Sequence, residues 1–84
     1  MRIYMQTPPG IDKAPRYYHL FLQEDLLDGW TLVKESGNQG SSGRLQRQHF
    51  ASHEEAQMAL VKARDAQLKR GYRVVFAKGD EHSA

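Results

Sequence analysis

The stretch that decides the fold is residues 17–50, which read YYHLFLQEDLLDGWTLVKESGNQGSSGRLQRQHF. Apolar and polar side chains alternate from Tyr17 to Glu24 and again from Trp30 to Glu35, which is the period of a half-buried strand. Gly29 marks the turn between these two segments. A more polar strand follows from Arg44 to Phe50, and only one of its faces can be core. The stretch therefore predicts the middle of a mainly antiparallel sheet.

The loop at residues 36–43 is rich in glycine and serine, with glycines at Gly37, Gly40 and Gly43. This spacing matches neither Gly-x-Gly-x-x-Gly nor a P-loop, and a strand follows where those motifs need a helix N-terminus. The loop is then either a long hairpin connection that needs positive φ angles, or a backbone contact for an anion or a partner. Both interpretations remain open from the sequence.

A helix is predicted from about residue 53 to residue 70, because Ser52 and Glu55 form a capping box and Gly71 suits the residue after the helix. One narrow stripe at helical spacing carries small and apolar side chains: Ala56, Ala59, Leu60, Ala63 and Ala66. We expect this stripe to face the sheet. The central leucine should then be buried against Leu20, Leu22 or Trp30.

Short strands at residues 2–6 and 72–77 complete the prediction. The expected fold class is α+β, with a mainly antiparallel sheet of four to five strands and one helix packed across one face. The chain divides into an N-terminal strand and linker, a domain and a polar tail, at residues 1–16, 17–77 and 78–84.

Composition limits the classes of function. The 84 residues make one small domain, and 12 basic against 10 acidic residues give a net charge of only +2. Any affinity for nucleic acid must therefore come from local clustering of charge. The absence of cysteine excludes disulfides and thiolate chemistry. With no leader-like segment and no apolar run of membrane length, a cytoplasmic protein that does not enter a membrane is expected.

Catalysis and metal binding are not predicted. The histidines at positions 19, 49, 53 and 82 stand in no recognised triad order. His49 and His53 are four residues apart, but the helix begins between them, so the spacing does not make a metal pair. We expect no catalytic residues, no metal and no cofactor, and hence a non-enzymatic protein.

Two groups of basic residues are candidates for binding. Lys34, Arg44 and Arg47 flank the loop, and a second group lies late in the helix and after it: Lys62, Lys69, Arg70 and Arg73. Basic side chains beside aromatic residues and an open loop are typical of a nucleic-acid surface. Interspersed carboxylates also fit an ordinary solvated surface. A further apolar group at Met58, Val61 and Leu68 would either pack under the terminal strands or face a partner.

The order of these elements resembles the WGR domain, a small module of poly(ADP-ribose) polymerases that also occurs as short bacterial proteins. The resemblance covers roughly residues 16–73 and rests on the order and spacing of Tyr17-Tyr18, Gly29-Trp30, Gly37, Phe50 and Gly71-Tyr72. The Trp-Gly-Arg tripeptide of the family aligns with Ser36-Gly37-Asn38, so only the glycine matches. A lysine common late in the family's helix corresponds to Gln67.

The resemblance implies a domain that contacts DNA near strand breaks, with the signature tryptophan and arginine taking part. We therefore expect a non-enzymatic, monomeric binding module with weak, non-specific and salt-sensitive affinity for DNA or RNA. The residues expected to carry this binding are Lys34, Gly37, Asn38, Arg44 and Arg47. The alternative is a protein–protein interaction domain that kept the scaffold but lost DNA-end recognition.

Overall fold

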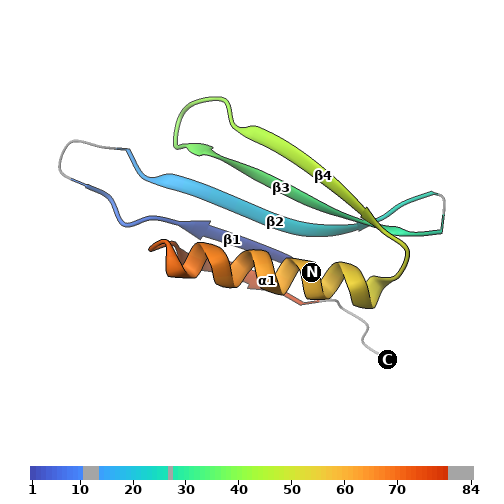
Figure 1. The fold of residues 1–84 in the computed structure, drawn as a ribbon. Helices are drawn as coiled ribbons and strands as arrows, with labels where there is room; N and C mark the ends of the chain where they lie inside the picture. Colours follow the sequence, from blue (N-terminus) through green and yellow to red (C-terminus); the bar gives the residue numbers. More distant parts are fainter. Residues whose placement is uncertain (11–13, 27, 80–84) are drawn as a thin grey trace.

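The structure is a computed structural model, and it describes residues 1–10, 14–26 and 28–79. Within these ranges the chain forms five strands and one helix in two layers (Figure 1). The elements in chain order are β1 (Arg2–Gln6), β2 (Arg16–Glu24), β3 (Trp30–Asn38), β4 (Arg44–Phe50), α1 (His53–Lys69) and β5 (Arg73–Lys78). The predicted α+β class is confirmed. The parts of the predicted linker, turn and tail at residues 11–13, 27 and 80–84 lie outside the described residues.

The strands form one sheet in the order β4-β3-β2-β1-β5, and each neighbouring pair is antiparallel. The first strand lies inside the sheet, between β2 and β5, so its alternate residues Ile3 and Met5 enter the core. The β2–β3 register places Leu20 opposite Lys34 and Leu22 opposite Leu32. On each strand, every second side chain therefore points to the face of the sheet that α1 covers.

Helix α1 begins and ends as the sequence predicts. The Ser52 hydroxyl accepts a hydrogen bond from the backbone N–H of Glu55 at 3.2 Å, which satisfies a donor in the first turn. At the other end the N–H of Tyr72 donates to the carbonyl of Gln67 at 3.1 Å. This reversal needs Gly71, whose φ of 99° lies in the left-handed region.

The hydrophobic core lies between α1 and the sheet. Leu60 is fully buried in a cluster with Leu20 and Leu22, and Trp30 packs at its margin, which confirms the expected packing of the helix. One position of the predicted stripe differs: Ala66 is exposed, and Gln67 is buried instead. The reason is geometric, because residues 56, 60 and 67 stay closer to one side at 3.6 residues per turn.

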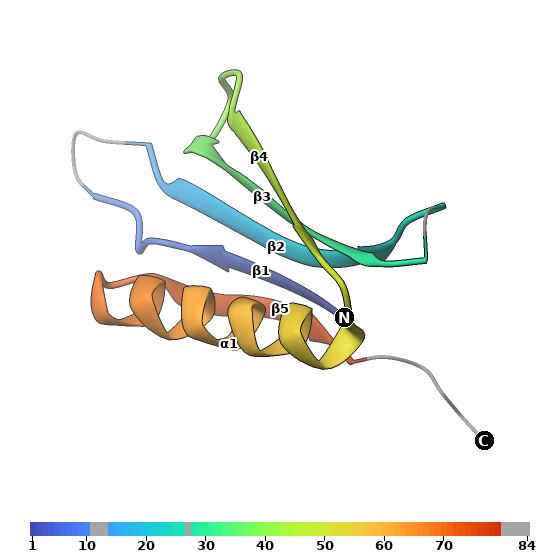
Figure 2. The same ribbon diagram turned by 45° about the vertical axis from the view of Figure 1, so that its right-hand side comes forward.

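The helix covers only part of the sheet. It packs against β2, β3 and β4, and Figure 2 shows it lying along one side of the strands. A helix is about 10 Å wide, and neighbouring strands are about 4.8 Å apart, so one helix covers roughly two strands. The five-stranded sheet is therefore wider than the helix. The edge strand β5 is accordingly exposed, with Val74, Val75 and Phe76 at 44%, 59% and 49% of their full accessible area.

Candidate functional site

A hollow of about 260 Å³ opens where the end of β3 meets the end of α1. We call it the tripeptide cleft, and its lining residues are Arg16, Tyr18, Ser36, Gly37, Asn38, Gln67, Arg70 and Tyr72. The β2–β3 register brings its two strands together, because Arg16 pairs with Asn38 and Tyr18 pairs with Ser36. The cleft therefore contains the whole tripeptide at residues 36–38.

The reversal after α1 builds the other wall of the cleft. Gly71 turns the chain so that the Tyr72 ring meets the Tyr18 ring edge-on, with centroids 5.8 Å apart and planes at 78°. Burial raises the pKa of Tyr18 above its ordinary 10.0, with a further rise from Tyr72 and a partial offset from Arg70. The Tyr18 phenol is thus neutral at physiological pH and keeps its O–H as a donor.

Gln67 gives the cleft an unsatisfied acceptor. Its side chain is only 8% exposed, and its Oε1 accepts no hydrogen bond from any of the described residues. A buried polar atom without a partner costs on the order of 1–3 kcal/mol. The oxygen is itself shielded from solvent, so a donor from outside reaches it only if the Gln67 side chain turns toward the cleft.

The electrostatic character of the cleft is mixed. Arg16 and Arg70 line it, and the described lining residues include no carboxylate. The C-terminal end of α1 carries partial negative charge, which opposes an approaching anion within about one turn. Backbone N–H groups of residues 70–72 already bond the Gln67 and Leu68 carbonyls, which reduces this effect. The arginines can therefore attract an anion only moderately.

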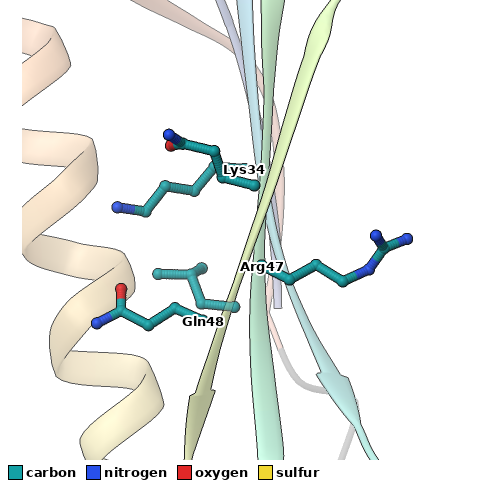
Figure 3. A pocket seen from close by; sticks show the side chains of 5 residues that line it. Lys34, Arg47 and Gln48 are labelled. Atoms are coloured by element: carbon teal, nitrogen blue, oxygen red, sulfur yellow. The ribbon is translucent and has the colours of Figure 1, made fainter.

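The binding residues expected from the sequence fall in different places. Gly37 and Asn38 line the tripeptide cleft, and Arg44 pairs with Ser36 across β3–β4. Lys34 lies on the same side of the sheet as Arg44 and lines a second hollow of about 410 Å³, whose lining residues all come from β3 and β4. Figure 3 shows Lys34 extending toward α1 and Arg47 extending away from it on the other face. The structure brings Lys34, Asn38 and Arg44 to the side of the sheet that α1 covers, whereas Arg47 and the strand position of Gly37 belong to the opposite face.

Several lining residues were not among the expected binding residues, namely Arg16, Tyr18, Gln67, Arg70 and Tyr72. Gln67 was noted only at the position of a family lysine, and Arg70 only within a basic group. These residues could not be found from the sequence because it does not show the β2–β3 register, which places Arg16 beside Asn38. The sequence did contain one signal for the residues near Tyr72, namely Gly71. A glycine at this place reverses the chain after the helix and returns it to the sheet.

The histidines have separate structural partners. His19 Nδ1 lies 3.8 Å from Glu35 Oε1, and His49 Nδ1 lies 2.8 Å from an Asp25 carboxylate oxygen. The His53 ring packs against Trp30 with centroids 4.5 Å apart. In the described part of the chain, no three metal-ligating side chains come together. Nor does any helix formed by these residues have the length and apolarity to cross a membrane.

The fold and the cleft define a small α+β domain in which the last three residues of the interior strand β3, Ser36-Gly37-Asn38, line a hollow beside the helix end. The family model described as the WGR domain matches residues 1–78, and the chain belongs to that family. The match includes β1, which lies in the interior of the sheet. A comparison with curated proteins found no match. A comparison with solved structures found none either.

Proposed function

We propose that this chain is a non-enzymatic module that binds nucleic acid weakly in the tripeptide cleft. The observation that carries the proposal is the composition of that cleft: Arg16 and Arg70 stand beside Tyr18 and Tyr72, and the described lining residues include no carboxylate. Membership of the WGR domain family supports nucleic acid as the ligand class. A cytoplasmic, monomeric protein is part of the same proposal.

Each lining group has a physical role in this proposal. The arginine forks donate to phosphate oxygens, and Lys34 and Arg44 add positive charge on the same side of the sheet. The Tyr72 ring offers an apolar surface to a sugar or a base. Once its side chain turns toward the cleft, Gln67 Oε1 accepts from a sugar hydroxyl or a base N–H, which relieves its unsatisfied state.

The same residues explain why binding should be weak. Ser36 has no surface on which a base can stack, and Asn38 carries no charge, although the family has tryptophan and arginine at these places. The C-terminal end of α1 further disfavours anions. We therefore expect no better than about micromolar affinity at physiological salt, in the range of ordinary non-specific binding.

A fluorescence anisotropy titration with nicked duplex, intact duplex and single strands tests the proposal. Arg70→Ala should weaken binding of the nicked duplex by about fivefold or more, because a charge-assisted hydrogen bond contributes about 1.5–3 kcal/mol. Lys62→Ala is the matched control, since it removes one exposed cation from the same helix away from the cleft. If Arg70→Ala and Lys62→Ala weaken binding equally, or if neither weakens it, the tripeptide cleft is not the binding site.

A protein partner is the second candidate, and one observation favours it. Met58 is 70% exposed on α1 and Leu68 is 41% exposed, whereas Val61 packs against the core. Met58 borders a shallow hollow with neighbours such as Gln57 and Asp65. If no nucleic acid binds at about 50 mM salt, where electrostatic binding is strong, this surface becomes the leading candidate.

A further inference from the structure

The face of the sheet opposite α1 is uncovered by any described element. We call it the open face, and the aromatic residues that the strands place on it are Tyr4, Tyr17, His19, Phe21 and Phe76. A sheet face without a second layer is normally polar, because only the covered face is core. Here its centre is aromatic, which calls for a physical explanation.

The aromatic rings on this face form a continuous row. Tyr4 and Tyr17 are stacked with centroids 6.1 Å apart and planes at 13°, and His19 meets Tyr4 edge-on at 5.7 Å. His19 also contacts Phe21, with centroids 5.0 Å apart. Phe76 lies opposite Tyr4 on the edge strand and is 49% exposed.

The row is held in place from both sides. Gly37 and Gly43 leave room for the Tyr17 ring, because a Cβ at Gly43 would overlap the Tyr17 hydroxyl. Gln39 in the β3–β4 loop donates from Nε2 to the Tyr4 hydroxyl at 2.8 Å. The glycine-rich loop therefore has a structural task, which is to position the aromatic rings. A surface that is already ordered loses little entropy when a ligand binds.

The charges around the row are mainly positive. Arg2, Arg47 and Arg73 occupy strand positions on the open face, and Glu35 is the single carboxylate among the described residues at such positions. The Arg2 guanidinium lies over the Phe21 ring, 4.8 Å from its centroid. No ion pair within the described residues neutralises any of these arginines. The surface thus combines flat rings with cations at its margins.

We propose that the open face binds a single-stranded nucleic acid, with bases stacked on the aromatic row and phosphates paired with the arginines. Single strands expose the π-faces that a duplex hides, and stacking together with cations is their usual mode of recognition. A protein surface is a poorer complement. The apolar Val33 is already 2% exposed without a partner, and docking would desolvate the arginines at a cost. This inference does not rest on the proposed function, because the cleft lies on the other side of the sheet.

Titration of a fluorescein-labelled oligothymidylate and an oligouridylate of about 12 nucleotides tests this proposal and separates DNA from RNA. Phe76→Leu should weaken binding by about fivefold or more, because it removes a ring and keeps an apolar side chain. Phe76→Tyr should bind like the unchanged chain. Phe76 is exposed on an edge strand, so both variants should fold, and far-UV circular dichroism checks that they do.

Charge provides an independent second measurement. Arg2→Ala with Arg47→Ala should reduce the slope of log affinity against log salt by about 1.4, because each lost single-strand phosphate contact contributes about 0.7. Lys62→Ala, on α1, should leave the affinity for single strands within about twofold. Amide chemical shifts should change at His19, Phe21 and Val33 on addition of the oligonucleotide.

The outcomes separate this proposal from the preceding one. Arg70→Ala should weaken only the nicked duplex, and Phe76→Leu should weaken only single strands. If neither oligonucleotide binds at about 50 mM salt, the proposal is overturned and the open face becomes a protein-docking candidate. It is also overturned if Phe76→Leu and the double substitution Arg2→Ala with Arg47→Ala leave the affinity for single strands unchanged. Amide chemical-shift changes that lie along the tripeptide cleft would overturn it as well.

Discussion

At the residue scale, two exchanges distinguish the tripeptide cleft from the signature of its family. By the resemblance described above, Ser36 and Asn38 correspond to the tryptophan and arginine of the family's signature, and Gly37 corresponds to its glycine. Gly37 packs closely against Gly43, since an added Cβ would lie 2.9 Å from the Gly43 Cα. This close packing leaves little room for a side chain at position 37.

Restoring both side chains should restore a preference for broken DNA. In Ser36→Trp with Asn38→Arg, the indole supplies a stacking surface and the guanidinium supplies donors for phosphate. Affinity for a nicked duplex should rise by about 1–3 kcal/mol relative to an intact duplex. Anisotropy titrations of both duplexes measure this difference. If the variant folds and shows no preference, the cleft is not a weakened DNA site, and a protein partner becomes the better proposal.

His19 should make stability depend on pH. Burial lowers its pKa below the ordinary 6.5, and Arg2 lowers it further, while Glu35 acts in the opposite direction. The unfolded chain then binds a proton more readily than the folded chain. Stability is therefore fully present above about pH 6.5 and is lost as the pH falls from there toward the folded pKa.

Urea unfolding at pH values between about 7.5 and 5 measures this effect. His19→Gln should flatten the pH dependence, because it removes the titrating group and keeps a polar side chain. Arg2→Ala should flatten it in part, since it removes the second cause of the shift. An unchanged pH dependence in His19→Gln would show that other groups are responsible.

At the scale of elements, α1 supplies the helix side of the hydrophobic core. Its buried residues, Ala56, Leu60 and Gln67, face strands β2 and β3, and the small side chain at position 56 allows close approach. The helix has little amphipathic character elsewhere, because charged and apolar residues alternate around its exposed sides. Its stability in the fold therefore comes mainly from this one contact surface.

Leu60→Ala should lower the free energy of unfolding by about 2–4 kcal/mol, because it leaves a cavity in a fully packed cluster. Met58→Ala is the matched control on the same helix, and its 70% exposure predicts a change within about 0.5 kcal/mol. Chemical denaturation of both variants measures the difference. Similar losses in the two variants would contradict the packing of α1 described above.

At the scale of the whole molecule, charge is distributed over two faces instead of being concentrated on one. The net charge is only +2. The β3–β4 register places Arg44 on the face of Lys34, and Figure 3 shows Arg47 on the opposite face. Neither face can neutralise many phosphates by itself. Any affinity for nucleic acid must therefore be modest and sensitive to salt.

This distribution predicts a shallow salt dependence for duplex DNA. With roughly three phosphate contacts from one face, log affinity should fall with log salt at a slope of about −2.7. Titrations of the unchanged chain between about 50 and 200 mM salt measure this slope. A slope near zero, or tight binding to one particular sequence, would contradict an electrostatic, sequence-independent mode.

The sequence by itself determined the elements and their class. Period-2 alternation located the strands, although β3 continues to Asn38 through three residues that were expected to belong to the loop. The capping box with Gly71 defined the helix ends to within a residue. The burial of Leu60 followed from the helical stripe. These features are local, because each depends on residues within a turn or a strand of one another.

Only the tertiary structure decided which residues share a surface. The β2–β3 register set Arg16 beside Asn38, and the reversal at Gly71 added Tyr72 to the cleft. The pleat placed Lys34 and Arg47 on opposite faces, although both flank the same loop. The aromatic row likewise needs β1 and β5 beside β2. The physical reason is that strand order and register come from packing between distant segments, and alternation along one strand carries no information about its neighbours.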